Sequence, residues 1–87
     1  MFQIQAFVFN FASENTYILF NENKNAWLID PGNMNEHETQ SISNFITENN
    51  LNIQKIVLTH AHIDHVLGLQ WAYNTFKVPV TMHQDDK

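Results

Sequence analysis

The sequence predicts an α/β layered domain whose elements follow one another in the order β-β-β-α-β-α-β. Short apolar runs rich in aromatic and β-branched residues indicate the strands, and apolar residues at helical spacing indicate the two helices. The chain has 87 residues, of which 44% are hydrophobic, and this suits one small domain or part of a larger one. No repeat, linker or low-complexity tract interrupts the order.

The first three strands are expected at 2–10, 16–20 and 26–30. The loop 21–25 between the second and third consists of turn-forming residues, and its length is typical of connections between antiparallel neighbours. Short connections of this kind predict a meander. Because each strand is a nearly continuous apolar run, burial on both faces of the sheet, or nearly so, is expected.

A helix is expected after the third strand. Asn35 is suited to cap its first turn, and Glu38 occupies the capping-box position three residues later. Asn49 and Asn50 tolerate the left-handed conformation in which helices often end. A short buried strand at 55–59 follows this helix.

A second helix is expected to end at Lys77, before a last strand at 80–83. Gly68, near the start of this helix, is expected to permit close packing of backbone. The apolar stripe of the helix consists of Leu69, Ala72, Tyr73 and Phe76.

The charge balance disfavours several kinds of partner. The net charge is −5, with nine acidic residues, four lysines and no arginine, so the chain lacks the basic face that nucleic-acid binding needs. Segment 1–9 has neither the basic start nor the cleavage site of a signal peptide, and no apolar run approaches membrane-spanning length. The chain has no cysteine, which fits a reducing compartment. We therefore expect a cytoplasmic protein with no nucleic-acid and no membrane partner.

The segment LTHAHIDHVLG, which begins at Leu58, contains three of the five histidines of the chain and one aspartate. It lies where strand 55–59 ends and the second helix begins, and the carboxyl ends of strands are the usual ligand sites of α/β proteins. Zinc binds imidazole nitrogen and carboxylate oxygen, and a catalytic zinc keeps a position open for water. Other divalent metals accept the same mixture, so the ligands do not fix the element.

The spacing of the four side chains suggests two metal ions. If 60–62 stays extended, His60 and His62 point the same way with their Cα atoms roughly 6–7 Å apart, so that both imidazoles can bind one ion. Asp64 and His65 follow where the chain turns into the helix, and from there they can hold a neighbouring ion. The loop therefore supplies two ligands to each of two adjacent metals.

Other interpretations explain less of this cluster. The four residues could be polar turn residues, with Asp64 as a helix cap. A general acid–base pair of one histidine and Asp64 would leave the other two histidines unexplained. A serine triad is weaker, because none of Ser13, Ser41 and Ser43 has the context of a nucleophile elbow.

The sequence THAHIDH at 59–65 resembles the HxHxDH signature of the metallo-β-lactamase superfamily. The preceding stretch 14–32 is similar to the first strands of its glyoxalase II-like branch, where an aspartate also ends a strand before Pro-Gly. The match in element order runs over nearly the whole chain. The resemblance implies that 1–87 is the N-terminal half of an αββα sandwich.

The resemblance also implies a role for each residue of the motif. His60 and His62 would bind the first metal, and Asp64 and His65 the second. Asp30 would be an outer carboxylate that orients the metal loop, as ligating histidines commonly need. An ordinary Asp-Pro-Gly turn is the alternative for Asp30.

The activity implied by the resemblance is metal-dependent hydrolysis, with a thioester of the hydroxyacyl-glutathione type as substrate. Two divalent ions, zinc or else iron or manganese, would share a hydroxide that attacks the carbonyl carbon. Asp64 would be catalytic as well as a ligand, because it can accept a hydrogen bond from the hydroxide and orient it. The rivals are an iron-dependent persulfide dioxygenase, a β-lactamase, and a non-catalytic metal-binding or interaction module.

Members of the family carry further ligands beyond the point that corresponds to Lys87: a third histidine, a bridging aspartate and a last histidine. The resemblance thus implies that the C-terminal half of the domain is absent from 1–87. The chain alone is then expected to be inactive and to hold metal weakly or not at all. Its exposed core surface would favour self-association.

Overall fold

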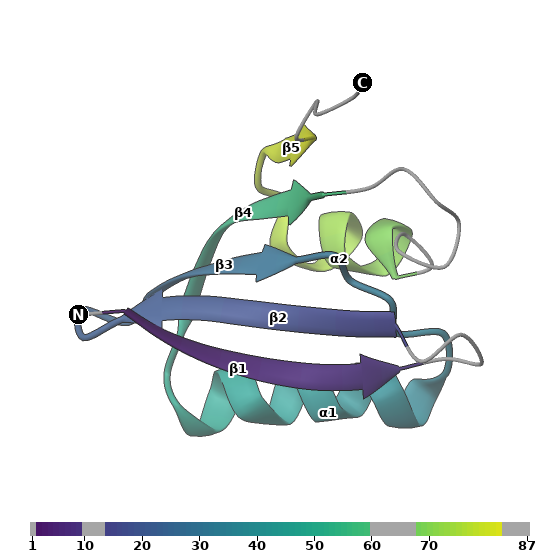
Figure 1. Cartoon of the computed structure of the whole chain (residues 1–87), viewed down its shortest axis with the longest axis horizontal. Coiled ribbons are helices and arrows are strands. Elements are labelled where there is room, and N and C mark those ends of the chain that lie inside the picture. Colours follow the sequence, from purple (N-terminus) through teal and green to yellow (C-terminus); the bar gives the residue numbers. More distant parts are fainter. Residues whose placement is uncertain (1, 10–13, 60–67, 83–87) are drawn as a thin grey trace.

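The computed structural model describes residues 2–9, 14–59 and 68–82. These residues form one five-stranded sheet and two helices in the predicted order (Figure 1). The elements are β1 (Phe2–Phe9), β2 (Glu14–Asn21), β3 (Asn25–Ile29), α1 (Glu36–Glu48), β4 (Asn52–Leu58), α2 (Leu69–Phe76) and β5 (Val80–Met82).

The strands lie in the sheet in sequence order, β1-β2-β3-β4-β5. The pairs β1–β2 and β2–β3 are antiparallel, which confirms the predicted meander. The pairs β3–β4 and β4–β5 are parallel, and α1 and α2 form their crossover connections. Because β3 and β4 are parallel neighbours, the residues that follow them, Asp30 and Thr59, come together at one edge of the sheet.

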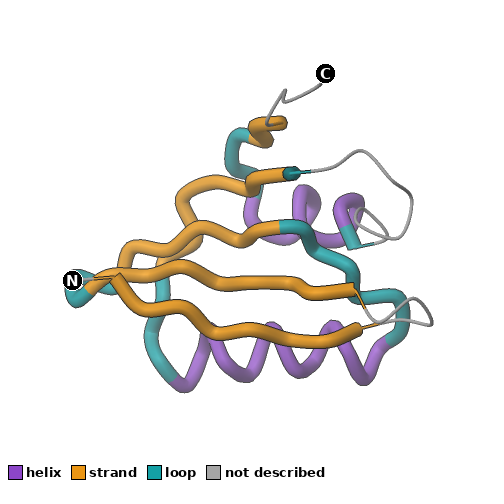
Figure 2. Tube along the Cα trace, viewed as in Figure 1, coloured by secondary structure: helices purple, strands orange, loops and turns teal. Residues whose placement is uncertain are grey.

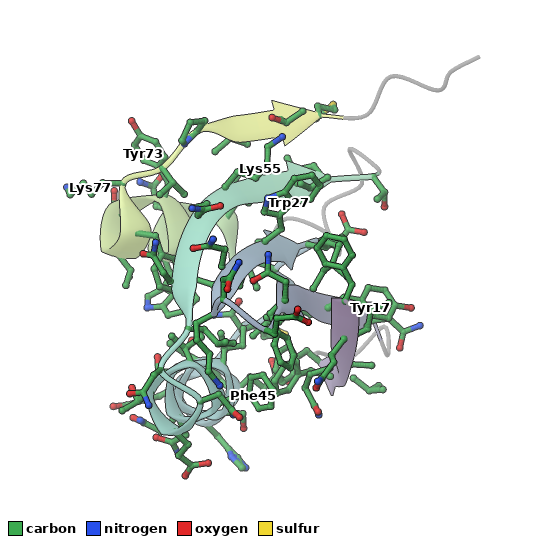
Figure 3. The ribbon with its side chains drawn as sticks, turned by 90° about the vertical axis from the view of Figure 1, so that its left-hand side faces the viewer. Tyr17, Trp27, Phe45, Lys55, Tyr73 and Lys77 are labelled. Atoms are coloured by element: carbon green, nitrogen blue, oxygen red, sulfur yellow. The ribbon has the colours of Figure 1, made fainter. Side chains whose placement is uncertain are left out.

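Both helices lie on the same face of the sheet (Figures 1 and 3). The core between the two layers includes Ile18, Leu28 and Ile56 from the sheet and Ile42 from α1, and all four are fully buried. Removing each such side chain from water contributes about 1.5–3 kcal/mol to folding. Phe45 of α1 extends toward the sheet and makes edge-to-face contacts with aromatic rings of β1 and β2.

The opposite face of the sheet is open, so the expected burial on both faces is wrong for the described residues. Phe2, Ile4 and Val8 alternate along β1 with inward-facing residues and are 67%, 66% and 65% exposed. Trp27 of β3 is 40% exposed on the same face, where the ammonium group of Lys55 lies 4.4 Å from its ring centroid. A continuous apolar run identifies a strand but does not show what covers each of its faces.

The start of α1 follows the sequence prediction closely. The Asn35 side chain accepts a hydrogen bond from the Glu38 backbone N–H at 2.9 Å. The Glu38 carboxylate in turn accepts from the Met34 N–H at 2.8 Å, one residue earlier than in the usual capping box. These reciprocal bonds fix the direction in which the chain enters the helix.

The end of α1 is a Schellman motif, in which only Asn50 of the two predicted terminators is left-handed, while Asn49 has φ of −104°. Asn50 adopts the left-handed conformation with φ of 56°. Its N–H donates to the Thr47 carbonyl at 3.2 Å, and the Leu51 N–H donates to the Ile46 carbonyl at 3.0 Å. The motif directs the chain into β4.

Helix α2 ends with Lys77 in the left-handed conformation, at φ 55°, close to the predicted end. Ala72 is fully buried, but Tyr73, which was expected on the apolar stripe, is 50% exposed. In the described part of the chain, no helix has both the length and the apolar character needed to cross a bilayer.

Candidate metal centre

The four predicted ligands His60, His62, Asp64 and His65 lie outside the described residues. Within the described ranges, no group of three or more histidine, cysteine, aspartate or glutamate residues could hold a metal ion. The structure does describe the two residues that flank the ligand segment, Thr59 and Gly68, and what holds each of them. The described part of the candidate site therefore consists of Thr59, Gly68 and the residues that contact them.

Asp30 holds the residue that precedes the first predicted ligand. Its carboxylate accepts a hydrogen bond from the Thr59 backbone N–H at 2.8 Å, and its second oxygen accepts one from the Thr59 hydroxyl. Asp30 is only 4% exposed and Thr59 is half-buried, so the two bonds lie at the boundary of the core. The carboxylate lies at the carboxyl edge of two parallel strands, where α/β proteins place their ligands.

The backbone at Asp30 is left-handed, with φ of 53°. Aspartate tolerates this conformation better than most residues, but it still stores strain of about 1–2 kcal/mol per residue. Thr16 of β2 stabilises the strained turn through two hydrogen bonds. Its hydroxyl donates to the Asp30 carbonyl at 2.7 Å and accepts from the Gly32 N–H at 2.9 Å. The Thr16 side chain is fully buried, so the turn is fixed by the core of the sheet.

The turn that begins with Asp30 also contacts the start of α2. The Gly68 N–H donates to the Pro31 carbonyl at 2.8 Å, and the buried Asn33 side chain lies directly against Gly68. The predicted close backbone packing at Gly68 is thus confirmed. Figure 2 shows the loop after β3, in teal, passing beside the first residues of α2.

The sequence pattern reveals neither the partners of Thr16 nor the burial of Asn33. Thr16 lies 14 residues from Asp30 in the chain, so no local pattern connects them. Polar residues after a Pro-Gly pair are ordinary in turns. The burial of Asn33 depends on the position of α2, which the sequence does not reveal.

A hollow of about 210 Å³ lies elsewhere, on the open face of the sheet. It lies around the amino-terminal end of β3, whereas Asp30 follows the carboxyl end of that strand. The hollow is therefore separate from the candidate metal centre. Its lining residues are Phe2, Leu19, Asn21, Asn25, Trp27 and Gln54.

The described residues thus show a sheet with helices on one face and a buried aspartate at its carboxyl edge, bonded to the residue that precedes the histidine-rich segment. The sequence profile of the metallo-beta-lactamase superfamily matches residues 10–87, and the chain belongs to this superfamily. The resemblance inferred from 59–65 is confirmed at the level of the family.

Curated relatives include metallohydrolases of several bacteria. The chain is 34% identical over 73 residues to the Bacillus subtilis protein named "Probable metallo-hydrolase YqgX", covering 84% of this chain and 32% of that protein. It is 45% identical over 53 residues to hydroxyacylglutathione hydrolase 1 of Vibrio vulnificus, covering 61% and 19%. It is 39% identical over 57 residues to the hydroxyacylglutathione hydrolase of Hydrogenovibrio crunogenus, covering 62% and 19%. The chain thus spans about a third or less of the length of these relatives.

Two solved structures share the fold. The crystal structure of the BLEG-1 B3 metallo-beta-lactamase superposes with a TM-score of 0.79 and 28% identity, over 90% of this chain and 35% of that one. The structure of ETHE1 from Myxococcus xanthus gives a TM-score of 0.74 at 22% identity, over 90% and 34%. The predicted fold class is confirmed by these similarities.

One described residue, Asp30, suits the outer surroundings of a metal centre, whereas the predicted ligands lie outside the described residues. Ligating histidines need a carboxylate or carbonyl nearby that fixes their orientation. Asp30 supplies a buried carboxylate bonded to the residue just before His60, at the edge where the predicted ligands must begin. The donor set of three imidazoles and one carboxylate at 60–65 suits zinc and also other divalent metals.

Proposed function

We propose that the protein containing this chain is a metal-dependent hydrolase of a thioester of the hydroxyacyl-glutathione type. The observation that carries the proposal is the bond between the buried Asp30 carboxylate and Thr59, directly before the HxHxDH motif. Several relatives bear the name hydroxyacylglutathione hydrolase, with 38–45% identity in three of them. Those names support the substrate class, and the reaction of this protein is inferred from them.

In this proposal, His60 and His62 hold one divalent ion, and Asp64 and His65 hold a second. Such ions lower the pKa of bound water and polarise a carbonyl group, which supplies a nucleophile near neutral pH. Asp64 would have a second task, because its carboxylate could accept a hydrogen bond from the attacking hydroxide and orient it. Asp30 touches no substrate; it keeps the start of the ligand segment in place.

The experiment compares His60→Ala with the unaltered protein, using zinc content and hydrolysis of a hydroxyacyl-glutathione thioester. We expect His60→Ala to lose at least one metal ion and its hydrolytic activity, because one ligand of the first metal is gone. His37→Ala is the matched control, since His37 is an exposed histidine on α1 far from the motif in sequence. Normal turnover by His60→Ala would contradict the proposal.

The sequence also left open an iron-dependent persulfide dioxygenase. The similarity to ETHE1 supports the shared fold only, at 22% identity. Iron content together with oxygen uptake in the presence of a glutathione persulfide would favour the dioxygenase. Zinc binding with no turnover of either substrate would favour a non-catalytic metal-binding module.

A further inference from the structure

We propose that the turn Asp30–Asn33 clamps both ends of the ligand segment, with Asn33 and Gly68 as positioning residues for the metal centre. The contacts of the turn with Thr59 and Gly68 join described residues only. The effect of these contacts on metal binding rests on the proposed function. The ligand segment is 60–67, and the clamp acts on the residues on either side of it, Thr59 and Gly68.

The upstream end of the ligand segment is held by the first residue of the turn. Asp30 accepts two hydrogen bonds from Thr59, one from the backbone and one from the hydroxyl. The Asp30 N–H itself donates to the Val57 carbonyl at 2.9 Å, which ties the turn to β4. The direction in which the chain leaves β4 is therefore set by Asp30.

The downstream end is held by the rest of the same turn. The Gly68 N–H donates to the Pro31 carbonyl at 2.8 Å, and Gly68 is buried. A Cβ atom on residue 68 would lie 1.8 Å from the Asn33 Oδ1, 2.6 Å from its Cγ and 3.0 Å from the Pro31 carbonyl oxygen. Only glycine allows α2 to begin this close to the turn.

Asn33 cannot easily move aside for a larger residue. It is 3% exposed, and its Nδ2 donates to the Thr39 hydroxyl on α1 at 2.7 Å. Its Oδ1 has no hydrogen-bond partner among the described residues, although a buried amide oxygen normally has one. The side chain is thus wedged between α1 and the start of α2, where it acts as a spacer that sets their separation.

The two contacts together determine where the ligand segment begins and ends. Metal centres require their ligands within a few tenths of an ångström, so a shift of either end is transmitted to the ligands through the chain. Loss of groups that orient ligands typically lowers metal affinity by about 10- to 100-fold.

The test uses Gly68→Ala and the double variant Gly68→Ala/Asn33→Ala, each made in the longer protein that contains this chain, with two readouts. The first is hydrogen exchange of the backbone amides of residues 59 and 68 in the metal-free protein, with the Ile56 amide as reporter of global opening. Ile56 is fully buried in β4, and its N–H donates to the Pro79 carbonyl at 3.0 Å. The second readout is zinc affinity by competition with a chelator. Asn74→Ala, on the exposed side of α2, is the control.

We expect Gly68→Ala to expose the residue-68 amide to faster exchange while the Ile56 amide is unchanged, and to weaken zinc binding by about tenfold or more. The double variant should recover part of both losses, because removing the Asn33 amide frees the space that the new methyl group needs. The Pro31 carbonyl oxygen still lies 3.0 Å from that methyl group, so recovery should be incomplete.

A protected residue-68 amide in Gly68→Ala would overturn the clamp. If the residue-68 amide of Gly68→Ala exchanges faster but the zinc affinity is unchanged, the positioning role of Gly68 for the metal centre would be overturned. If the unaltered protein binds no zinc, the proposed function fails instead, and the clamp is then judged by exchange alone. Equal acceleration at residue 68 and Ile56 would reduce Gly68 to a general packing residue and also contradict the inference.

Discussion

At Asp30 a single residue combines a left-handed backbone, a buried carboxylate and two hydrogen bonds from Thr59. Strained conformations persist where surrounding structure over-determines them, and they are frequent at functional sites. Thr16 and Gly32 provide that support here. The alternative interpretation of Asp30, an ordinary Asp-Pro-Gly turn, accounts for the turn but not for the two hydrogen bonds between the Asp30 carboxylate and Thr59.

Asp30→Ala should therefore affect both stability and metal binding. Loss of the carboxylate leaves the Thr59 N–H without this acceptor, which costs about 1–3 kcal/mol in the free energy of unfolding measured with urea. Zinc affinity should fall by about 10- to 100-fold, because the start of the ligand segment is released. Both quantities should be measured on the same variant.

Asp30→Asn is the matched comparison, since asparagine accepts a left-handed backbone and its amide oxygen can still bond the Thr59 N–H. We expect Asp30→Asn to lose less of both quantities than Asp30→Ala. An alanine variant with unchanged zinc affinity would show that Asp30 serves only the turn.

Among the elements, α1 has the clearest determinants in its own sequence. Its start rests on Asn35 and Glu38, and its end on the left-handed Asn50. Asn35→Ala should lower the free energy of unfolding by about 1 kcal/mol, because one helix N–H loses its acceptor. Urea denaturation measures this loss, and zinc affinity should stay unchanged because the cap does not touch the turn. A change in zinc affinity without loss of stability would contradict this assignment.

The accuracy of the sequence predictions differs between elements for a physical reason. Caps and turn residues act over three or four positions, so the bounds of α1 and the end of α2 could be predicted closely. The contacts of Thr16 with Asp30 and of Asn33 with Gly68 join residues far apart in the chain, and no periodicity encodes them. The family motif predicted a role for Asp30. The contact between Asn33 and Gly68 could be found only in the folded structure.

At the scale of the whole molecule, the dominant feature is the contrast between the two faces of the sheet. The helix-covered face is packed, and the open face carries the exposed apolar residues Phe2, Ile4, Val8 and Trp27. Figure 3 shows Trp27 on the side of the sheet away from the helices. A patch of this kind on an isolated domain promotes association. The chain spans 32% of the length of YqgX.

We expect the isolated 87-residue chain to self-associate through this face. Light scattering should give a mass well above 10.2 kDa, and Ile4→Glu combined with Trp27→Glu should shift the chain toward the monomer. Gln40→Glu combined with Asn44→Glu, on the exposed side of α1, adds the same two charges away from the face and should not shift it. A compact monomer that melts cooperatively without any substitution would contradict the prediction.

The central claim is that His60, His62, Asp64 and His65 hold two divalent ions at the carboxyl edge of β3 and β4. Anomalous X-ray scattering from crystals of the longer protein that contains this chain, saturated with zinc, tests it most directly. The account predicts two peaks about 3.5–4 Å apart, next to Thr59 and bounded by these four side chains. A zinc-saturated crystal without a peak at that edge, or with the histidines directed away from it, would contradict the claim.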